Sequence, residues 1–169
     1  LGTSAGIENQ GVRSIALGTS AGSYEQGDNS IALGFATGSN NQGNNSIALG
    51  NSAGYDSQGT YGVAIGYQTG KNYQGEYAVA IGALAGENTQ HNNTIVLNAT
   101  GISLNSVTTD GLYVAPVREN ISTNNEVVFY NTDTKEVVYD TTKQSVPTAS
   151  CDGDYLVWNT TDGVWNVGS

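Results

Sequence analysis

The chain has 169 residues and a hydrophobic content of 37%, enough for one ordinary domain but too little for a large aliphatic core. Its 15 acidic and 5 basic residues give a net charge of −10, so it lacks the basic surface that nucleic acid requires. Because Cys151 is the single cysteine, the chain cannot form an intrachain disulfide. The sequence has no Cys/His cluster for a metal site, and none of its apolar runs is long enough for direct membrane insertion.

The first 98 residues repeat every sixteen. "SIALGTSAGSYEQGDN" (14–29) is followed at once by "SIALGFATGSNNQGNN", and the chain begins inside such a unit, so we expect a piece of a longer protein. Three glycine series hold the register: Gly2, Gly18, Gly34, Gly50, Gly66 and Gly82; Gly6, Gly22, Gly38, Gly54, Gly70 and Gly86; Gly11, Gly27, Gly43, Gly59 and Gly75. Strict repetition of this kind is typical of a solenoid, in which each coil packs only on its neighbours.

Each unit predicts two short strands and two tight turns, with glycine wherever φ is positive or a Cβ has no room. One strand alternates a β-branched residue, an alanine and a leucine or isoleucine, as in Ile47, Ala48 and Leu49, which puts alanine on the face opposite the larger side chains. A glutamine recurs in the other half of each unit, and we expect the glutamines to stack as an amide ladder: Gln10, Gln26, Gln42, Gln58, Gln74 and Gln90.

A coil with so few large side chains buries too little surface to offset its chain entropy alone. We therefore predict an obligate oligomer in which the small alanine face lets identical coils approach closely. The residues predicted at this interface are Ala16, Ala32, Ala48, Ala64 and Ala80.

The recurring "SIALG" and "AVAIG" motifs resemble the head repeats of trimeric autotransporter adhesins of the YadA type, over residues 1 to about 98. That resemblance implies a left-handed parallel β-roll and an intertwined homotrimer at an extracellular, virion or cell surface. The "AG…QG" half of the unit and the connector after residue 98 look more like fibre proteins of large DNA viruses and phages.

After the repeat domain (1–98) we expect a connector with a β-hairpin domain (99–143), then a linker and a C-terminal β-hairpin (144–169). "VFYNTDTKEVVY" (128–139) and "LVWNTTDGVWNV" (156–167) each place a polar turn between two alternating strands. Trp158 and Trp165 face each other across the second hairpin, and we predict that they are buried against symmetry copies.

Motifs for catalysis are missing: the sequence has no phosphate-binding loop, no nucleophile elbow and a single histidine, His91. Carboxylate pairs such as Asp152 with Asp154 could in principle cleave a glycosidic bond. On an exposed hairpin, such pairs are more often solvated surface residues. We expect no enzyme, no cofactor and no metal. Sixteen is not a multiple of six, which also argues against a hexapeptide acyltransferase.

Tyrosines concentrate in the fourth and fifth units, where an amphipathic patch of phenols suits a host-surface glycan or protein receptor. The alternative is that these side chains only fill strand surface. The candidate binding residues are Tyr55, Tyr61, Tyr67, Tyr73 and Tyr77. The leading hypothesis is a non-enzymatic, homotrimeric fibre or adhesin segment that mediates attachment. A carbohydrate-binding module is the alternative, and a polysaccharide-acting enzyme is the third hypothesis.

Overall fold

The computed structural model describes residues 1–118, 128–139, 155–159 and 164–168. The chain divides into two units, Leu1–Val117 and Arg118–Ser169, which are described separately. Within the described residues every regular element is a β-strand, so the prediction of an all-β fold is confirmed. There is accordingly no helix in this part of the chain that could span a membrane.

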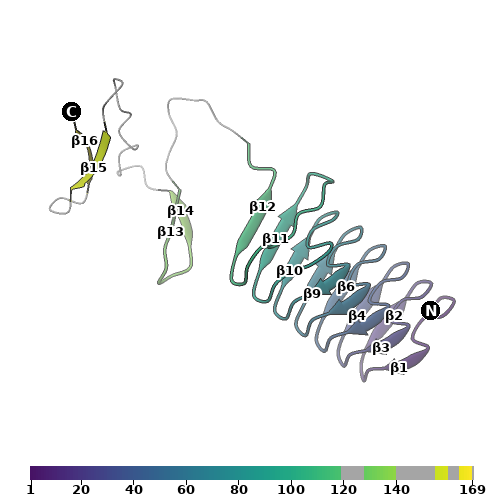
Figure 1. Cartoon of the computed structure of the whole chain (residues 1–169). Helices are drawn as coiled ribbons and strands as arrows, with labels where there is room; N and C mark the ends of the chain where they lie inside the picture. Colours follow the sequence, from purple (N-terminus) through teal and green to yellow (C-terminus); the bar gives the residue numbers. More distant parts are fainter. Residues whose placement is uncertain (119–127, 140–154, 160–163, 169) are drawn as a thin grey trace. The chain divides into compact units, whose positions relative to one another are not determined.

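The first unit is a parallel β-solenoid, in which successive coils stack in chain order (Figure 1). The predicted repeat architecture is thus confirmed, while its left-handedness and its trimeric state stay predictions. One sheet has the order β1-β3-β5-β7-β9, with β1 (Glu8–Gln10), β3 (Tyr24–Gln26), β5 (Asn40–Gln42), β7 (Asp56–Gln58) and β9 (Asn72–Gln74). The other has the order β12-β11-β10-β8-β6-β4-β2, with β2 (Ile15–Leu17), β4 (Ile31–Leu33), β6 (Ile47–Leu49), β8 (Val63–Ile65), β10 (Val79–Ile81), β11 (Ile95–Asn98) and β12 (Leu112–Ala115).

The pairing register equals the sequence repeat. Ile31 pairs with Ile47 and Leu33 with Leu49, and in the other sheet Gln42 pairs with Gln58, each sixteen residues on. Backbone bonds between coils continue outside the strands, for example from the Gly38 amide to the Ala53 carbonyl at 2.9 Å. Each coil therefore uses its neighbours to satisfy its backbone, as a solenoid must.

The interior of the coil is lined by small and polar side chains. Ala32, Ala48, Ala64 and Ala80 are 0% exposed in the single chain, whereas Ile47 and Leu49 on either side of Ala48 are 37% and 38% exposed. The expectation that the alanine column forms the outer, self-associating face is therefore corrected: it points into the coil. The glutamines of the facing sheet, such as Gln58, share this interior, so the space left beside them fits a methyl group and the larger members of the strand turn outward.

The glutamine column also lies inside, but the predicted amide ladder is mostly wrong. Gln42 donates from Nε2 to the carbonyl of Ile31 in its own coil at 2.8 Å, and Gln58 does the same to Ile47 at 2.9 Å. Among the described residues, only Gln74 reaches the next glutamine, donating to Gln90 Oε1 at 3.0 Å. The amides therefore bridge the two sheets of each coil more than they link successive coils.

The recurring glycines occur for the two predicted reasons, a positive φ and a lack of room for a Cβ. Gly54 has φ +53°, and a Cβ there would lie 2.8 Å from Gln58 Oε1, so it is both left-handed and crowded. Gly27 has an ordinary φ, but a Cβ would come within 2.5 Å of the backbone of Gly43 in the next coil. The Gly27 column therefore sets how closely the coils stack, and the Gly54 column leaves space for the glutamine inside the coil.

The parallel sheet continues past residue 98. β12 pairs with β11, Ile95 opposite Leu112, so the spacing lengthens here from sixteen to seventeen residues. His91 lies at this end of the solenoid, where its backbone amide donates to Ser106 Oγ at 2.7 Å and its ring Nδ1 lies 2.9 Å from the same oxygen. His91 therefore has a structural role at this end of the repeats, where it contacts the loop that contains Ser106.

The second unit contains two antiparallel strand pairs at the predicted hairpin positions. β13 (Val128–Tyr130) pairs with β14 (Val137–Tyr139), and β15 (Tyr155–Asn159) pairs with β16 (Val164–Gly168), with Trp158 opposite Trp165. The two tryptophan side chains lie outside the described residues, as do the predicted linker around Cys151 and both carboxylates of the Asp152–Asp154 pair. The division into hairpin domains and the role of the tryptophans stay predictions.

Candidate functional site

The outer face of the seven-stranded sheet carries two columns of aliphatic side chains, which we call the apolar stripe. Most of its members are partly exposed to solvent in the single chain, from 37% for Leu33 to 57% for Leu112. Its residues are Ile15, Leu17, Ile31, Leu33, Ile47, Leu49, Val63, Ile65, Val79, Ile81, Ile95, Leu97, Leu112 and Val114. A continuous apolar face of this kind marks an interaction surface.

The stripe is a set of exposed aliphatic side chains that follows the strands of one sheet from coil to coil. Inside the coil, the buried hydrophobic residues are alanines and Val96, and the largest fully buried side chain is Gln90. Complete burial of one leucine or isoleucine is worth about 1.5–3 kcal/mol. Because the exposed stripe residues are 37–57% exposed, burial on association would add a part of this amount for each side chain, which the alanines inside the coil do not supply.

The predicted tyrosines do not gather in one patch around a common hollow. Tyr61 and Tyr77 stack on each other at one corner of successive coils, with ring centroids 4.9 Å apart and planes 17° apart. Tyr73 stands in the middle of β9 and is 64% exposed, and Tyr67, 52% exposed, follows β8 in the turn. Tyr55 alone lines the groove described below.

Three of these tyrosines adopt left-handed backbone conformations, with φ of 60° at Tyr61, 55° at Tyr73 and 54° at Tyr77. Other coils place asparagine at equivalent positions, such as Asn45 and Asn41, which tolerate this conformation better than an aromatic residue does. The tyrosines are thus held in a locally unfavourable backbone state by the stacking of the coils.

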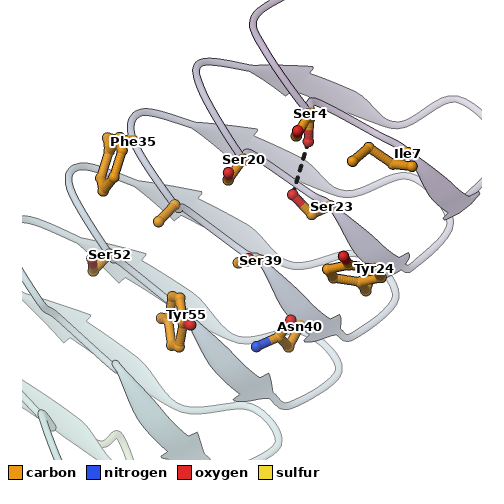
Figure 2. A pocket seen from close by; sticks show the side chains of 11 residues that line it. Ser4, Ile7, Ser20, Ser23, Tyr24, Phe35, Ser39, Asn40, Ser52 and Tyr55 are labelled. Atoms are coloured by element: carbon orange, nitrogen blue, oxygen red, sulfur yellow. Dashed lines mark hydrogen bonds between the residues drawn. The ribbon is translucent and has the colours of Figure 1, made fainter.

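An open groove of about 460 Å³ runs across the N-terminal coils on the side of the five-stranded sheet (Figure 2). Its aromatic members are Tyr24 at the start of β3, Phe35 in the turn after β4, and Tyr55 just before β7. The remaining lining residues are Ser4, Ile7, Ser20, Ser23, Ala36, Ser39, Asn40 and Ser52. Sequence reasoning missed this groove, although Phe35 stands where the two preceding coils have threonine, Thr3 and Thr19, and that departure was visible.

The described residues contain no group of three or more His, Cys, Asp or Glu side chains that could hold a metal ion. Groove-lining residues include no acidic or basic side chain. The chemistry that this surface offers is hydroxyl, amide and aromatic contact. It lacks the paired acid and base that hydrolysis would need.

Comparison with protein families gives two matches to the YadA head domain repeat, over residues 10–37 and 26–53. Residues 10–53 therefore resemble YadA head repeats, and this resemblance points to an adhesin-like surface protein. The likeness of the connector to viral fibres has no support from this comparison. Searches of curated proteins and of solved structures gave no match.

Proposed function

We propose that this chain is a segment of a homotrimeric adhesin displayed on a cell or virion surface, where it mediates attachment without catalysis. The solenoid forms the body of the fibre, and the apolar stripe joins three copies around a common axis. The likeness to YadA head repeats supports both parts of the proposal, because proteins with these repeats are adhesins and adhesins of this type are trimeric. The observation that carries the proposal is the apolar stripe on the seven-stranded sheet.

The stripe replaces the alanine column as the proposed trimer interface. Ala48 has no exposed surface with which to meet a partner, while Ile47 and Leu49 project from the same strand and remain over a third exposed. Burial of both columns in three chains would give the assembly the apolar core that a single coil lacks. Self-association is thus coupled to the stability of the coil.

The test is the mass of the whole 169-residue chain by light scattering. We expect three times the chain mass of 17.5 kDa.

The double variant Ile47→Asp with Leu49→Asp places two charges at the centre of the stripe and should dissociate or unfold the assembly. The control is Asn41→Asp, an exposed site on the other sheet, which should leave the mass unchanged.

A monomeric, folded wild-type chain would overturn the proposal. So would a double variant that keeps both the trimeric mass and the wild-type melting temperature, because the stripe would then not be the contact. Circular dichroism melting of each variant separates dissociation from unfolding, and either result in the double variant agrees with the interface.

A further inference from the structure

The groove on the five-stranded side is separate from the apolar stripe, with which it shares no residue. We propose that this groove binds an uncharged, linear carbohydrate chain that lies across successive coils. This inference rests on the proposed adhesin function and names the class of ligand that the surface recognises.

The aromatic side chains supply the apolar part of such a site. Phe35 is 57% exposed and Tyr24 46% exposed, and Figure 2 shows these two and Tyr55 around the pocket, each on a different coil. Exposed rings whose backbone is held by stacked coils pack against the C–H faces of sugar rings at little cost in conformational entropy. Ile7, which is 54% exposed, extends this apolar surface toward the first coil.

Polar groups between the rings are left free to bind a ligand. Ser39 is only 6% exposed, yet its hydroxyl lines the groove and has no hydrogen-bond partner among the described residues. The Asn40 side-chain amide and the Ser20 hydroxyl are likewise without a partner in the described part of the chain. The Ser23 hydroxyl differs, because it donates to the Ser4 carbonyl at 2.8 Å. The Ser39 hydroxyl opens into the groove, where it can bond to water or to a ligand hydroxyl.

The charge of the surface favours a neutral ligand. None of the eleven lining residues is acidic or basic, so an anionic sugar would find no cation with which to pair. The net charge of −10 also repels polyanions at long range. Sulfated and uronic acid chains are therefore poor occupants.

A bound peptide strand fits less well than a sugar chain. Extended peptides usually bind by pairing with a free sheet edge, but the backbone at this groove is already paired between coils. The Tyr24 amide donates to the Ser39 carbonyl and the Asn40 amide to the Tyr55 carbonyl, both at 2.9 Å. Specific binding must then come from side chains on successive coils, which stack about 4.8 Å apart. A polymer of repeating hydroxylated rings matches that arrangement.

The experiment measures binding of cellohexaose, mannohexaose, xylohexaose and maltohexaose to the full chain by calorimetry, with hexagalacturonate as the anionic probe. The variants use residues that other coils already carry: Phe35→Thr copies Thr19, and Tyr24→Asn copies Asn40. We expect at least one neutral hexasaccharide to bind, and each variant to weaken it about tenfold. Tyr130→Thr, a similarly exposed site in the second unit, should not change the affinity.

Two further outcomes would overturn the inference. One is that no neutral probe binds, whether or not hexagalacturonate does. The other is binding that survives Phe35→Thr and Tyr24→Asn but is lost with Tyr73→Asn, which would move the site to the tyrosines predicted from sequence. In each case a trimeric mass by light scattering shows that the adhesin proposal still stands, whereas a monomer would overturn that proposal instead.

Discussion

The two sheets of the solenoid differ on both their inner and their outer faces. On the seven-stranded sheet, β6 points Ala48 inward and Ile47 and Leu49 outward. On the five-stranded sheet, β5 points Gln42 inward and leaves Asn41 exposed. Inside the coil, size and hydrogen bonding decide which residue fits. Outside it, one sheet is suited to contact with copies of the chain and the other to water and a polar ligand.

The largest effect should come from placing a charge between the sheets. Ala48→Glu puts a carboxylate at a position that is 0% exposed and has no basic partner nearby among the described core residues, so we expect loss of cooperative folding, a destabilisation of more than about 4 kcal/mol. Circular dichroism and light scattering measure it. Asn41→Glu is the control, since Glu25 occupies the same register on β3. A normal melting curve for Ala48→Glu would show that the alanine faces solvent.

A smaller effect should follow from removal of one internal amide. Gln58 donates to the Ile47 carbonyl at 2.9 Å and to the Gly62 carbonyl at 3.3 Å. Gln58→Leu keeps the volume but leaves those acceptors without their side-chain donor, so the free energy of unfolding should fall by about 1–2 kcal/mol. Denaturant unfolding checks this. Gln10→Leu, in the same column but exposed in the first coil, should change the stability by less than about 0.5 kcal/mol.

Equal losses for these two variants would contradict the comparison between interior and exterior. They would mean that the glutamine acts through the unfolded chain or through strand propensity, not through its bridge between the sheets. The unpaired Oε1 of Gln58 bears on the same question, because its removal in the leucine variant works against the loss and keeps the expected effect moderate.

The sequence predicted the period, the parallel stacking and the glycine columns, because each depends on strict spacing along the chain. It did not predict which face of "IAL" points inward. Alternation shows only that Ile47 and Leu49 share a face opposite Ala48. The glutamines of the facing sheet fill much of the interior and leave space for the smaller residue, and that space is a tertiary property. The groove was missed for a related reason: Tyr24, Phe35 and Tyr55 come from three coils at unequal spacing and line one groove only when the coils stack.

The smallest effect concerns the exposed tyrosines and should be a gain. Tyr73 is 64% exposed with φ of 55°, while Asn41 and Asn9 take the same backbone state at equivalent positions. Tyr73→Asn should therefore raise the free energy of unfolding by up to about 1 kcal/mol, because asparagine tolerates the left-handed region better. Tyr77→Asn is the informative comparison: it relieves similar strain but removes the stack with Tyr61, worth about 0.5–1.5 kcal/mol, so its net change should be near zero or negative. Thermal melts of both variants decide the matter. If Tyr73→Asn lowers the melting temperature as much as Tyr77→Asn does, the phenol of Tyr73 makes a stabilising contact that backbone strain does not outweigh.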